Sequence, residues 1–131
     1  MGEDRITLIV PAKSEYAKTV RMTASALVSR MGMSYDEVDD VRMAADEAFI
    51  YAVETLSAAD DVRLEFAVGD GELTIDVAVG NQEFGDDEEA ERRASYATFI
   101  LESVCDKVEF ASDEHGPHLR LKKRVGSGDG D

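Results

Sequence analysis

The sequence predicts an α/β (α+β) sandwich of two layers, in which three helices cover one face of a mixed, mostly antiparallel sheet. One observation is a long helical pattern over residues 34–56. A second is the alternation of apolar residues in short segments on both sides of a Gly69-Asp70-Gly71 turn. The third is the order of these patterns, which is strand, helix, helix, two strands, acidic segment, helix and two strands.

The N-terminal segment predicts one strand and one helix. Apolar residues alternate over residues 6–10, and Pro11 ends this strand because proline has no amide hydrogen to donate to a sheet. Over residues 15–31 the apolar residues recur at helical intervals, and Gly32 follows as a C-terminal stop.

Residues 34–56 carry the strongest helical pattern. Ser34 and Glu37 have the spacing of a capping box, in which a hydroxyl and a carboxylate bind free amide groups at the helix start. The apolar stripe that we expect in the core contains Val38, Val41, Ala45, Ala48, Phe49, Ala52, Val53 and Leu56. A second line on this helix contains Met43, Glu47, Tyr51 and Glu54, so Glu47 and Tyr51 lie one turn apart.

The C-terminal half predicts a hairpin, a helix and two further strands. Residues 62–68 and 73–79 alternate as the two strands of the hairpin. We predict a loop or short helix over residues 80–93, because acids crowd there: Glu83, Asp86, Asp87, Glu88, Glu89 and Glu91. Helical spacing returns over residues 95–105, through Tyr96, Phe99, Ile100, Ser103 and Val104. The last strands are marked by Val108, Phe110, Leu119, Leu121 and Val125.

Length and charge limit the classes of function. Residues 1–125 are most simply one domain, and the tail at 126–131, GSGDGD, is predicted to be disordered because it is polar and rich in glycine. Lys and Arg number 14 against 29 Asp and Glu, which gives a net charge of −15. Such a charge repels nucleic acid and anionic membranes and favours basic protein surfaces. We therefore expect a protein partner, with no nucleic acid and no membrane.

The remaining reactive side chains indicate no metal or disulfide. Cys105 is the only cysteine, which excludes an intrachain disulfide; we expect it to be a small core residue. His115 and His118 lack a third ligand and make a poor metal site. The start of the chain has no signal-peptide pattern, and no apolar run reaches the roughly 18 residues of a spanning helix, so the expected location is the cytoplasm.

The first half of the chain, PAKSEYAKTVRMTASALVSRMGMSYDEVDDVRMAADEAFIYAV, contains three features of one family. These are an arginine in the first helix, a glycine before the second helix and the glutamate of a Glu-x-x-x-Asn box, here Arg21, Gly32 and Glu47. With the order of elements, they resemble the RsbW-like anti-sigma factor serine kinases of the GHKL ATPase superfamily, over nearly the whole chain before the tail. The resemblance implies a GHKL or Bergerat-type ATPase fold.

The resemblance also locates the family's nucleotide site on this sequence, where several residues depart from the motif. It implies that Glu47 is the general base toward water or a seryl hydroxyl. Tyr51 stands where the family has the Asn that binds magnesium, and a phenol is a poor magnesium ligand. The Asp that binds the adenine amino group aligns with Val79, followed by Gly80 and Asn81.

A further departure concerns the phosphates. The family's Gly-x-Gly turn, which holds phosphate at the start of the third helix, aligns with Ser95-Tyr96-Ala97, whose side chains obstruct a close backbone approach. The preceding acidic segment is short for a nucleotide lid, and only Arg92 and Arg93 offset its charge. We therefore expect a degenerate pocket with no ATP and no magnesium as cofactors.

The function implied by the resemblance is an anti-sigma-factor-like regulator that works by protein binding in a bacterial partner-switching pathway, as a pseudokinase. Its partners would be a sigma factor or an anti-anti-sigma protein, and it would form a homodimer. The candidate partner-binding residues are Arg21, Asp86, Asp87, Glu88 and Glu89. One alternative is an active serine kinase that binds ATP and magnesium and phosphorylates an anti-anti-sigma protein with Glu47 as base. Another is a regulatory domain that senses a different small ligand.

Each candidate residue also has a plain structural explanation. Glu47 would be a helix glutamate that hydrogen-bonds Tyr51 or a nearby loop. Tyr51 would fill the space of the former pocket, because an empty cavity costs stability. Arg21 would belong to a surface salt bridge, and the acidic segment would be the solvated remnant of a lid.

Overall fold

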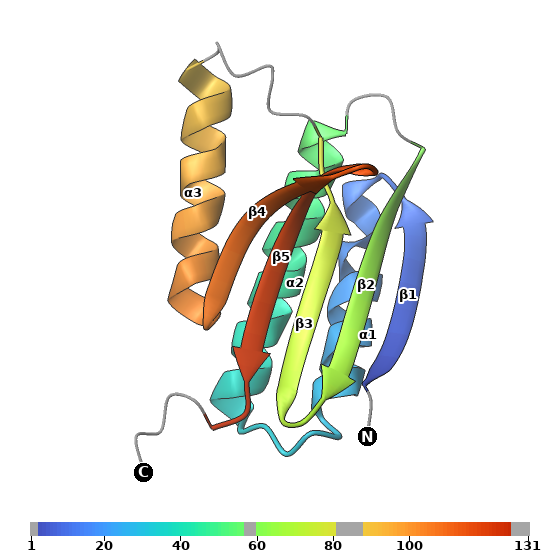
Figure 1. Cartoon of the computed structure of the whole chain (residues 1–131), viewed down its shortest axis with the longest axis vertical. Helices are drawn as coiled ribbons and strands as arrows, with labels where there is room; N and C mark the ends of the chain where they lie inside the picture. Colours follow the sequence, from blue (N-terminus) through green and yellow to red (C-terminus); the bar gives the residue numbers. More distant parts are fainter. Residues whose placement is uncertain (1–2, 57–59, 81–87, 127–131) are drawn as a thin grey trace.

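A computed structural model describes residues 3–56, 60–80 and 88–126, and its elements follow the predicted order (Figure 1). They are β1 (Asp4–Pro11), a 3-10 turn (Ser14–Tyr16), α1 (Ala17–Val28), α2 (Tyr35–Thr55), β2 (Asp61–Gly69), β3 (Glu72–Ala78), α3 (Glu88–Val104), β4 (Lys107–Asp113) and β5 (Gly116–Arg124). Apart from Gly126, the tail for which we predicted disorder lies outside the described residues. None of the helices among the described residues has the length and apolar character needed to cross a membrane.

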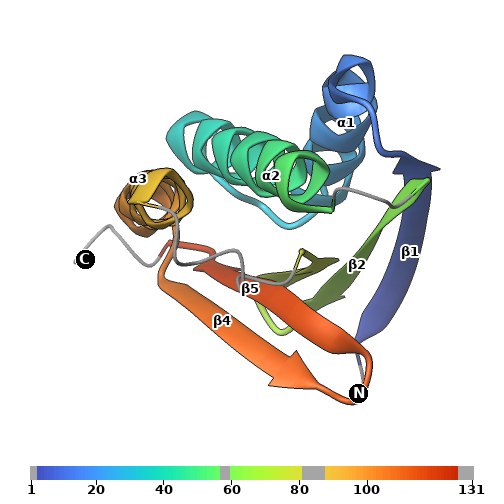
Figure 2. The ribbon, with the colours of Figure 1, turned by 90° about the horizontal axis from the view of Figure 1, so that it is seen from above.

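Within the described part of the chain, five strands form one sheet in the order β1-β2-β3-β5-β4, and every pairing among them is antiparallel. Viewed from above, the three helices lie on the same face of this sheet (Figure 2). The predicted two-layer architecture is therefore confirmed, with a sheet that is wholly antiparallel. The β2–β3 hairpin closes through Asp70 and Gly71, whose φ angles of 50° and 74° suit a two-residue turn between twisted strands.

The start of α2 has the predicted capping box. The Ser34 hydroxyl accepts a hydrogen bond from the Glu37 amide at 3.2 Å, and the Glu37 carboxylate accepts one from the Ser34 amide at 2.9 Å. The hydrogen bond from the Ser34 amide is the main reason why the pKa of Glu37 lies below its usual value. These contacts fix where α2 begins and hence the phase of its side chains.

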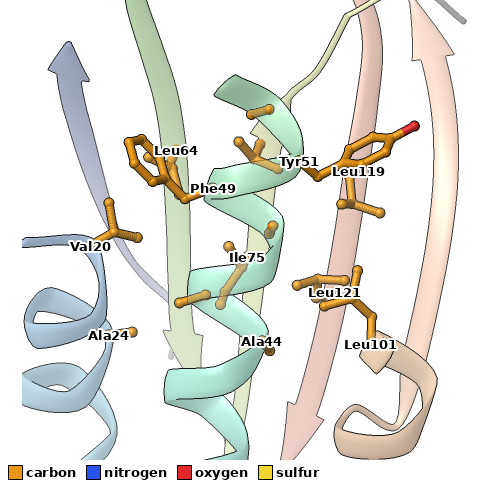
Figure 3. Close-up of a cluster of buried hydrophobic side chains, with 14 of the residues drawn as sticks. Val20, Ala24, Ala44, Phe49, Tyr51, Leu64, Ile75, Leu101, Leu119 and Leu121 are labelled. Carbon is orange, nitrogen blue, oxygen red and sulfur yellow. The ribbon is translucent and has the colours of Figure 1, made fainter. Parts of the chain in front are cut away.

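The core lies between the helices and the inward face of the sheet. Small side chains such as Ala24 of α1 and Ala48 of α2 are fully buried, which lets the helices approach each other and the sheet closely. Figure 3 shows that Phe49 and Tyr51 leave α2 in opposite directions, Phe49 toward Leu64 of β2 and Tyr51 toward Leu119 of β5. We call these two sides of α2 the Phe49 side and the Tyr51 side.

The start of α3 was predicted wrongly. The helix begins at Glu88, whereas the sequence pattern placed a loop or short helix over residues 80–93. Glu88, Glu89 and Glu91 occupy its first turn, where negative side chains interact favourably with the free amide groups of the helix start. The acids that suggested a solvated loop therefore help to begin the helix.

The inward face of α3 also differs from the expected one. Ala97, Leu101 and Val104 are the buried residues of the helix. Tyr96 and Phe99, which contributed to the predicted helical spacing, are 60% and 73% exposed. The aromatic residues thus lie on the outer side of α3, and small and aliphatic residues pack inward.

Candidate functional site

The candidate catalytic residue Glu47 lies on the side of α2 that faces α3. Its carboxylate oxygen Oε2 accepts a hydrogen bond from Nη1 of Arg93 at 2.7 Å, and Nε of the same guanidinium donates to Oε1 of Glu54 at 2.5 Å. The side chains of Glu47 and Arg93 are only 15% and 26% exposed. Burial alone would lower the pKa of Arg93, but its hydrogen bonds to Glu54 and Glu47 outweigh burial and raise it. Arg93 is therefore a cation that bridges α3 to two turns of α2.

Tyr51, at the position of the family's magnesium ligand, is almost fully buried. It is 2% exposed, and its ring lies edge-on to that of Phe110 of β4, with the ring centroids 5.9 Å apart. The guanidinium carbon of Arg93 lies 5.4 Å from the centre of the Tyr51 ring, within the range of a cation–π contact. Burial raises the pKa of Tyr51, partly opposed by the charge of Arg93, so the phenol is neutral at neutral pH.

Val79 and Gly80 pack against the C-terminal end of α2. Val79 is 3% exposed, and its side chain offers no acceptor for the amino group of adenine. The Gly80 amide donates to Oγ1 of Thr55 at 2.8 Å, and a Cβ atom on Gly80 would lie 1.8 Å from the Thr55 carbonyl oxygen. Position 80 therefore requires glycine because two backbone segments meet there.

The predicted turn at Ser95-Tyr96-Ala97 is wrong, because all three residues lie inside α3. Backbone amides in the interior of an α-helix are committed to hydrogen bonds with carbonyl groups four residues earlier, and they cannot cradle a phosphate. Ala97 is fully buried, and the exposed Tyr96 ring lies 5.9 Å from the guanidinium carbon of Arg93. Within residues 3–56, 60–80 and 88–126, no three His, Cys, Asp or Glu side chains are grouped to hold a metal ion.

The candidate partner-binding residues lie in two separate regions. Arg21 of α1 forms an ion pair with Asp46 of α2, with Nη1 and Oδ1 2.7 Å apart, which agrees with the salt-bridge explanation. Glu88 and Glu89 are exposed at the start of α3. Asn81, Asp86 and Asp87 lie outside the described residues.

The contacts of Cys105 and His118 agree with structural roles for both side chains. Cys105 is half-buried against the core, and burial raises the pKa of its thiol to about 12. Nδ1 of His118 lies 2.7 Å from Oδ1 of Asp76, and its Nε2 lies 3.3 Å from Oδ1 of Asp113. His118 thus links the outward-facing side chains of β3 and β4.

Arg93 is the residue of this site that the sequence analysis missed. It appeared there only as a charge that offsets neighbouring acids. A helix begun at Glu88 places Arg93 four residues before the buried Ala97, on the inward side of α3. The helical phase was therefore the signal that would have brought Arg93 toward α2.

Comparisons with known proteins agree with this fold. A family model described as "Histidine kinase-like ATPase domain" matches residues 10–123. The chain is 34% identical to "Serine-protein kinase RsbW" of Bacillus subtilis (strain 168) over 122 residues, which cover 80% of this chain and 76% of the relative. It is 30% identical to the protein of the same name from Listeria innocua over 128 residues, which cover 85% of this chain and 82% of the relative.

A solved structure gives the same result for the fold. The crystal structure of the RsbU and RsbW domains of Rv1364c from Mycobacterium tuberculosis aligns with a TM-score of 0.72 and 18% identity. The alignment covers 93% of this chain but only 32% of the longer chain. From these matches, the chain belongs to the family of histidine kinase-like ATPase domains, and within it to the RsbW serine-protein kinase family.

Proposed function

We propose that this chain is an anti-sigma-factor-like regulator that acts by protein binding in a bacterial partner-switching pathway, with a nucleotide pocket that no longer serves ATP. The observation that carries the proposal is the contact between Glu47 and Arg93 at 2.7 Å. A general base must be oriented toward the proton that it removes. Here one carboxylate oxygen of Glu47, Oε2, is paired with the cation Arg93 of α3, which also contacts Glu54, so an internal ion pair sets the orientation of this carboxylate.

The neighbouring residues support the same proposal. Tyr51 occupies space between α2, α3 and β4 as a neutral, buried phenol, which makes a poor magnesium ligand. Val79 lacks the carboxylate that would select adenine, and Gly80 is explained by its contact with Thr55. These residues do not fit a magnesium–nucleotide complex, and we derive no catalytic step through one.

The proposed partners are a sigma factor or an anti-anti-sigma protein, by analogy with the RsbW relatives. The net charge of −15 suits a partner with a basic contact surface. The homodimer and the cytoplasmic location expected from the family remain predictions.

The second candidate is an active serine kinase, and the name of the relatives favours it, because proteins 30% and 34% identical are called serine-protein kinases. Glu47, the implied base, is also retained. This mechanism requires Arg93 to leave Glu47 when nucleotide binds, so that the carboxylate can accept a seryl proton.

A comparison of Glu47→Ala with wild type separates the two functions. Affinity for sigma factors and anti-anti-sigma proteins encoded in the same genome is measured by biolayer interferometry, and phosphoryl transfer is measured with radiolabelled ATP and magnesium. We expect Glu47→Ala to retain its partner affinity within about twofold, with no transfer by either protein.

Glu54→Ala is the matched control, because it removes the other acid on Arg93 and leaves Glu47 in place. Phosphoryl transfer by wild type and Glu54→Ala that disappears in Glu47→Ala would establish the active kinase. Failure of wild type to bind any of these partners would refute the proposed binding function.

A further inference from the structure

The outer side of α3 carries two exposed aromatic residues that the proposed site does not use. Phe99 is 73% exposed and Tyr96 is 60% exposed. They are three residues apart, so their side chains share one face of the helix. The opposite face, with Ala97 and Leu101, is fully buried. The exposed rings therefore add little to the core, although exposing them to water is unfavourable.

The position of α3 leaves this face accessible. Seen from above, α3 lies at the end of the layer of helices, next to α2 (Figure 2). Figure 1 shows the helix along one flank of the molecule for its whole length. A second helix can therefore lie along it without displacing the described elements.

The charges around the rings restrict what can bind there. Glu88, Glu89 and Glu102 are exposed on the same helix. Arg92 lies beside them, with its side chain 75% exposed and 3.7 Å from the Glu88 carboxylate. We define the α3 outer face by five residues: Glu88, Arg92, Tyr96, Phe99 and Glu102. It combines an aromatic centre with an acidic border.

We propose that the α3 outer face docks a basic amphipathic helix of a partner protein. The apolar ridge of that helix covers Phe99 and Tyr96, and its Lys and Arg side chains pair with the bordering glutamates. A second copy of this chain is disfavoured, because two such faces would bring acids of proteins with net charge −15 together. Nucleic acid is disfavoured for the same reason.

The proposed surface lies beside the candidate site. The Tyr96 ring is 5.9 Å from the guanidinium carbon of Arg93, which holds Glu47. A helix docked over Tyr96 would therefore sit next to the bridge between α2 and α3. This inference rests on the proposed protein-binding function, but it does not depend on the state of the pocket.

The test uses a designed helical peptide with leucines on one face and lysines on the other, labelled for fluorescence anisotropy. A peptide with glutamates in place of the lysines is the charge control. Phe99→Ser is compared with Tyr35→Ser, because Tyr35 is a 92% exposed aromatic residue that belongs to the start of α2 and not to α3. We expect Phe99→Ser to weaken binding of the basic peptide at least about tenfold, whereas Tyr35→Ser leaves it unchanged. The acidic peptide should not bind.

Equal affinities of wild type and Phe99→Ser, or binding of neither peptide, would overturn the proposal. Sedimentation showing a dimer that Phe99→Ser dissociates would assign the face to a second copy and also overturn it. Magnesium–ATP is titrated into the same preparations. If nucleotide binds and peptide binding depends on Phe99, the degenerate pocket is refuted and docking at the α3 outer face is supported. If neither nucleotide nor peptide binds, docking at the α3 outer face is refuted and the degenerate pocket is not.

Discussion

The two sides of α2 are packed by different interactions. On the Phe49 side, buried apolar residues of α1, α2 and β2 pack together (Figure 3), and the ion pair between Arg21 of α1 and Asp46 of α2 is partly exposed. On the Tyr51 side, the cation Arg93 bridges two glutamates over a buried phenol ring. The first side depends on shape and hydrophobic burial, and the second depends on the geometry of a few polar groups. Glu47 and Tyr51, two positions that the resemblance assigns to nucleotide chemistry, belong to the second side.

This difference has an energetic consequence. Burial of apolar surface has no preferred direction and tolerates substitutions that conserve volume. A half-buried ion pair requires both partners, because the loss of one leaves the other charge poorly solvated. The Tyr51 side should therefore respond to changes of charge, and both sides should respond to changes of volume.

The largest expected effect compares Tyr51→Ala with Phe49→Ala. If Tyr51 fills its side of α2 as tightly as Phe49 fills the other, each substitution lowers the free energy of unfolding by about 3–5 kcal/mol. Urea denaturation of the two variants without nucleotide measures this. A Tyr51→Ala variant as stable as wild type would show that the ring lines an open pocket. The two sides of α2 would then not be filled equally tightly.

Gly80→Ala should follow, with a loss of about 1–3 kcal/mol, because its Cβ atom meets the Thr55 carbonyl oxygen at the end of α2. Gly32→Ala is the control: Gly32 has a φ of 80°, but among the described residues other than its two chain neighbours no atom lies within 4 Å of its Cβ position. The control costs about 1–2 kcal/mol from backbone conformation alone. Crystal structures of the two variants distinguish the steric clash at position 80 from the backbone strain at position 32, because only Gly80→Ala should displace the end of α2. An undisturbed α2 would contradict the account.

A double-mutant cycle of Arg93→Gln and Glu47→Gln tests the bridge. Both side chains are less than a third exposed, and we expect a coupling of about 1–2 kcal/mol, between the values for surface and buried pairs. Arg92→Gln is the control, because Arg92 is 75% exposed and its contact with Glu88 is 3.7 Å long; it should change stability by less than about 0.5 kcal/mol. Zero coupling energy between Arg93 and Glu47 would remove the main support for the proposal that Arg93 engages the candidate base Glu47.

The smallest effect concerns Cys105, near the N-terminal half of α2. Its folded pKa of about 12 lies above the value in the unfolded chain, so the unfolded state loses its proton first as pH rises. The stability that Cys105 contributes is complete below about pH 8.5 and declines above it. Urea midpoints at pH 7, 9 and 10 should fall more in wild type than in Cys105→Ala. Identical slopes would refute this contribution.

The sequence predicted the Phe49 side well. The capping box at Ser34 set the phase of α2, and the spacing of Ala45, Ala48 and Phe49 then placed them in the core. Periodicity succeeds here because hydrophobic burial repeats with the helix. Each of these residues carries the signal in its own side chain.

The sequence did not predict the Arg93 bridge on the Tyr51 side or the first turns of α3. Arg93 and Glu47 are 46 residues apart, and their contact depends on how α3 packs on α2. The acids at the start of α3 suggested a loop, so its first turns were not predicted as helix. Tyr96 and Phe99 are aromatic and fit the helical spacing of a buried face, although both are exposed. Gly80 matched a family glycine, but the reason for it became visible only in its contact with Thr55. Polar contacts between distant segments follow from tertiary packing and leave no periodic pattern.

Calorimetric titration of the purified protein with magnesium–ATP tests the central claim most directly. The RsbW relative from Bacillus subtilis, named a serine-protein kinase, serves as the comparison under the same conditions. We predict no heat of binding to this chain at millimolar nucleotide, because Arg93 holds Glu47 and Tyr51 fills the adjoining space. Micromolar binding of nucleotide would contradict the degenerate pocket.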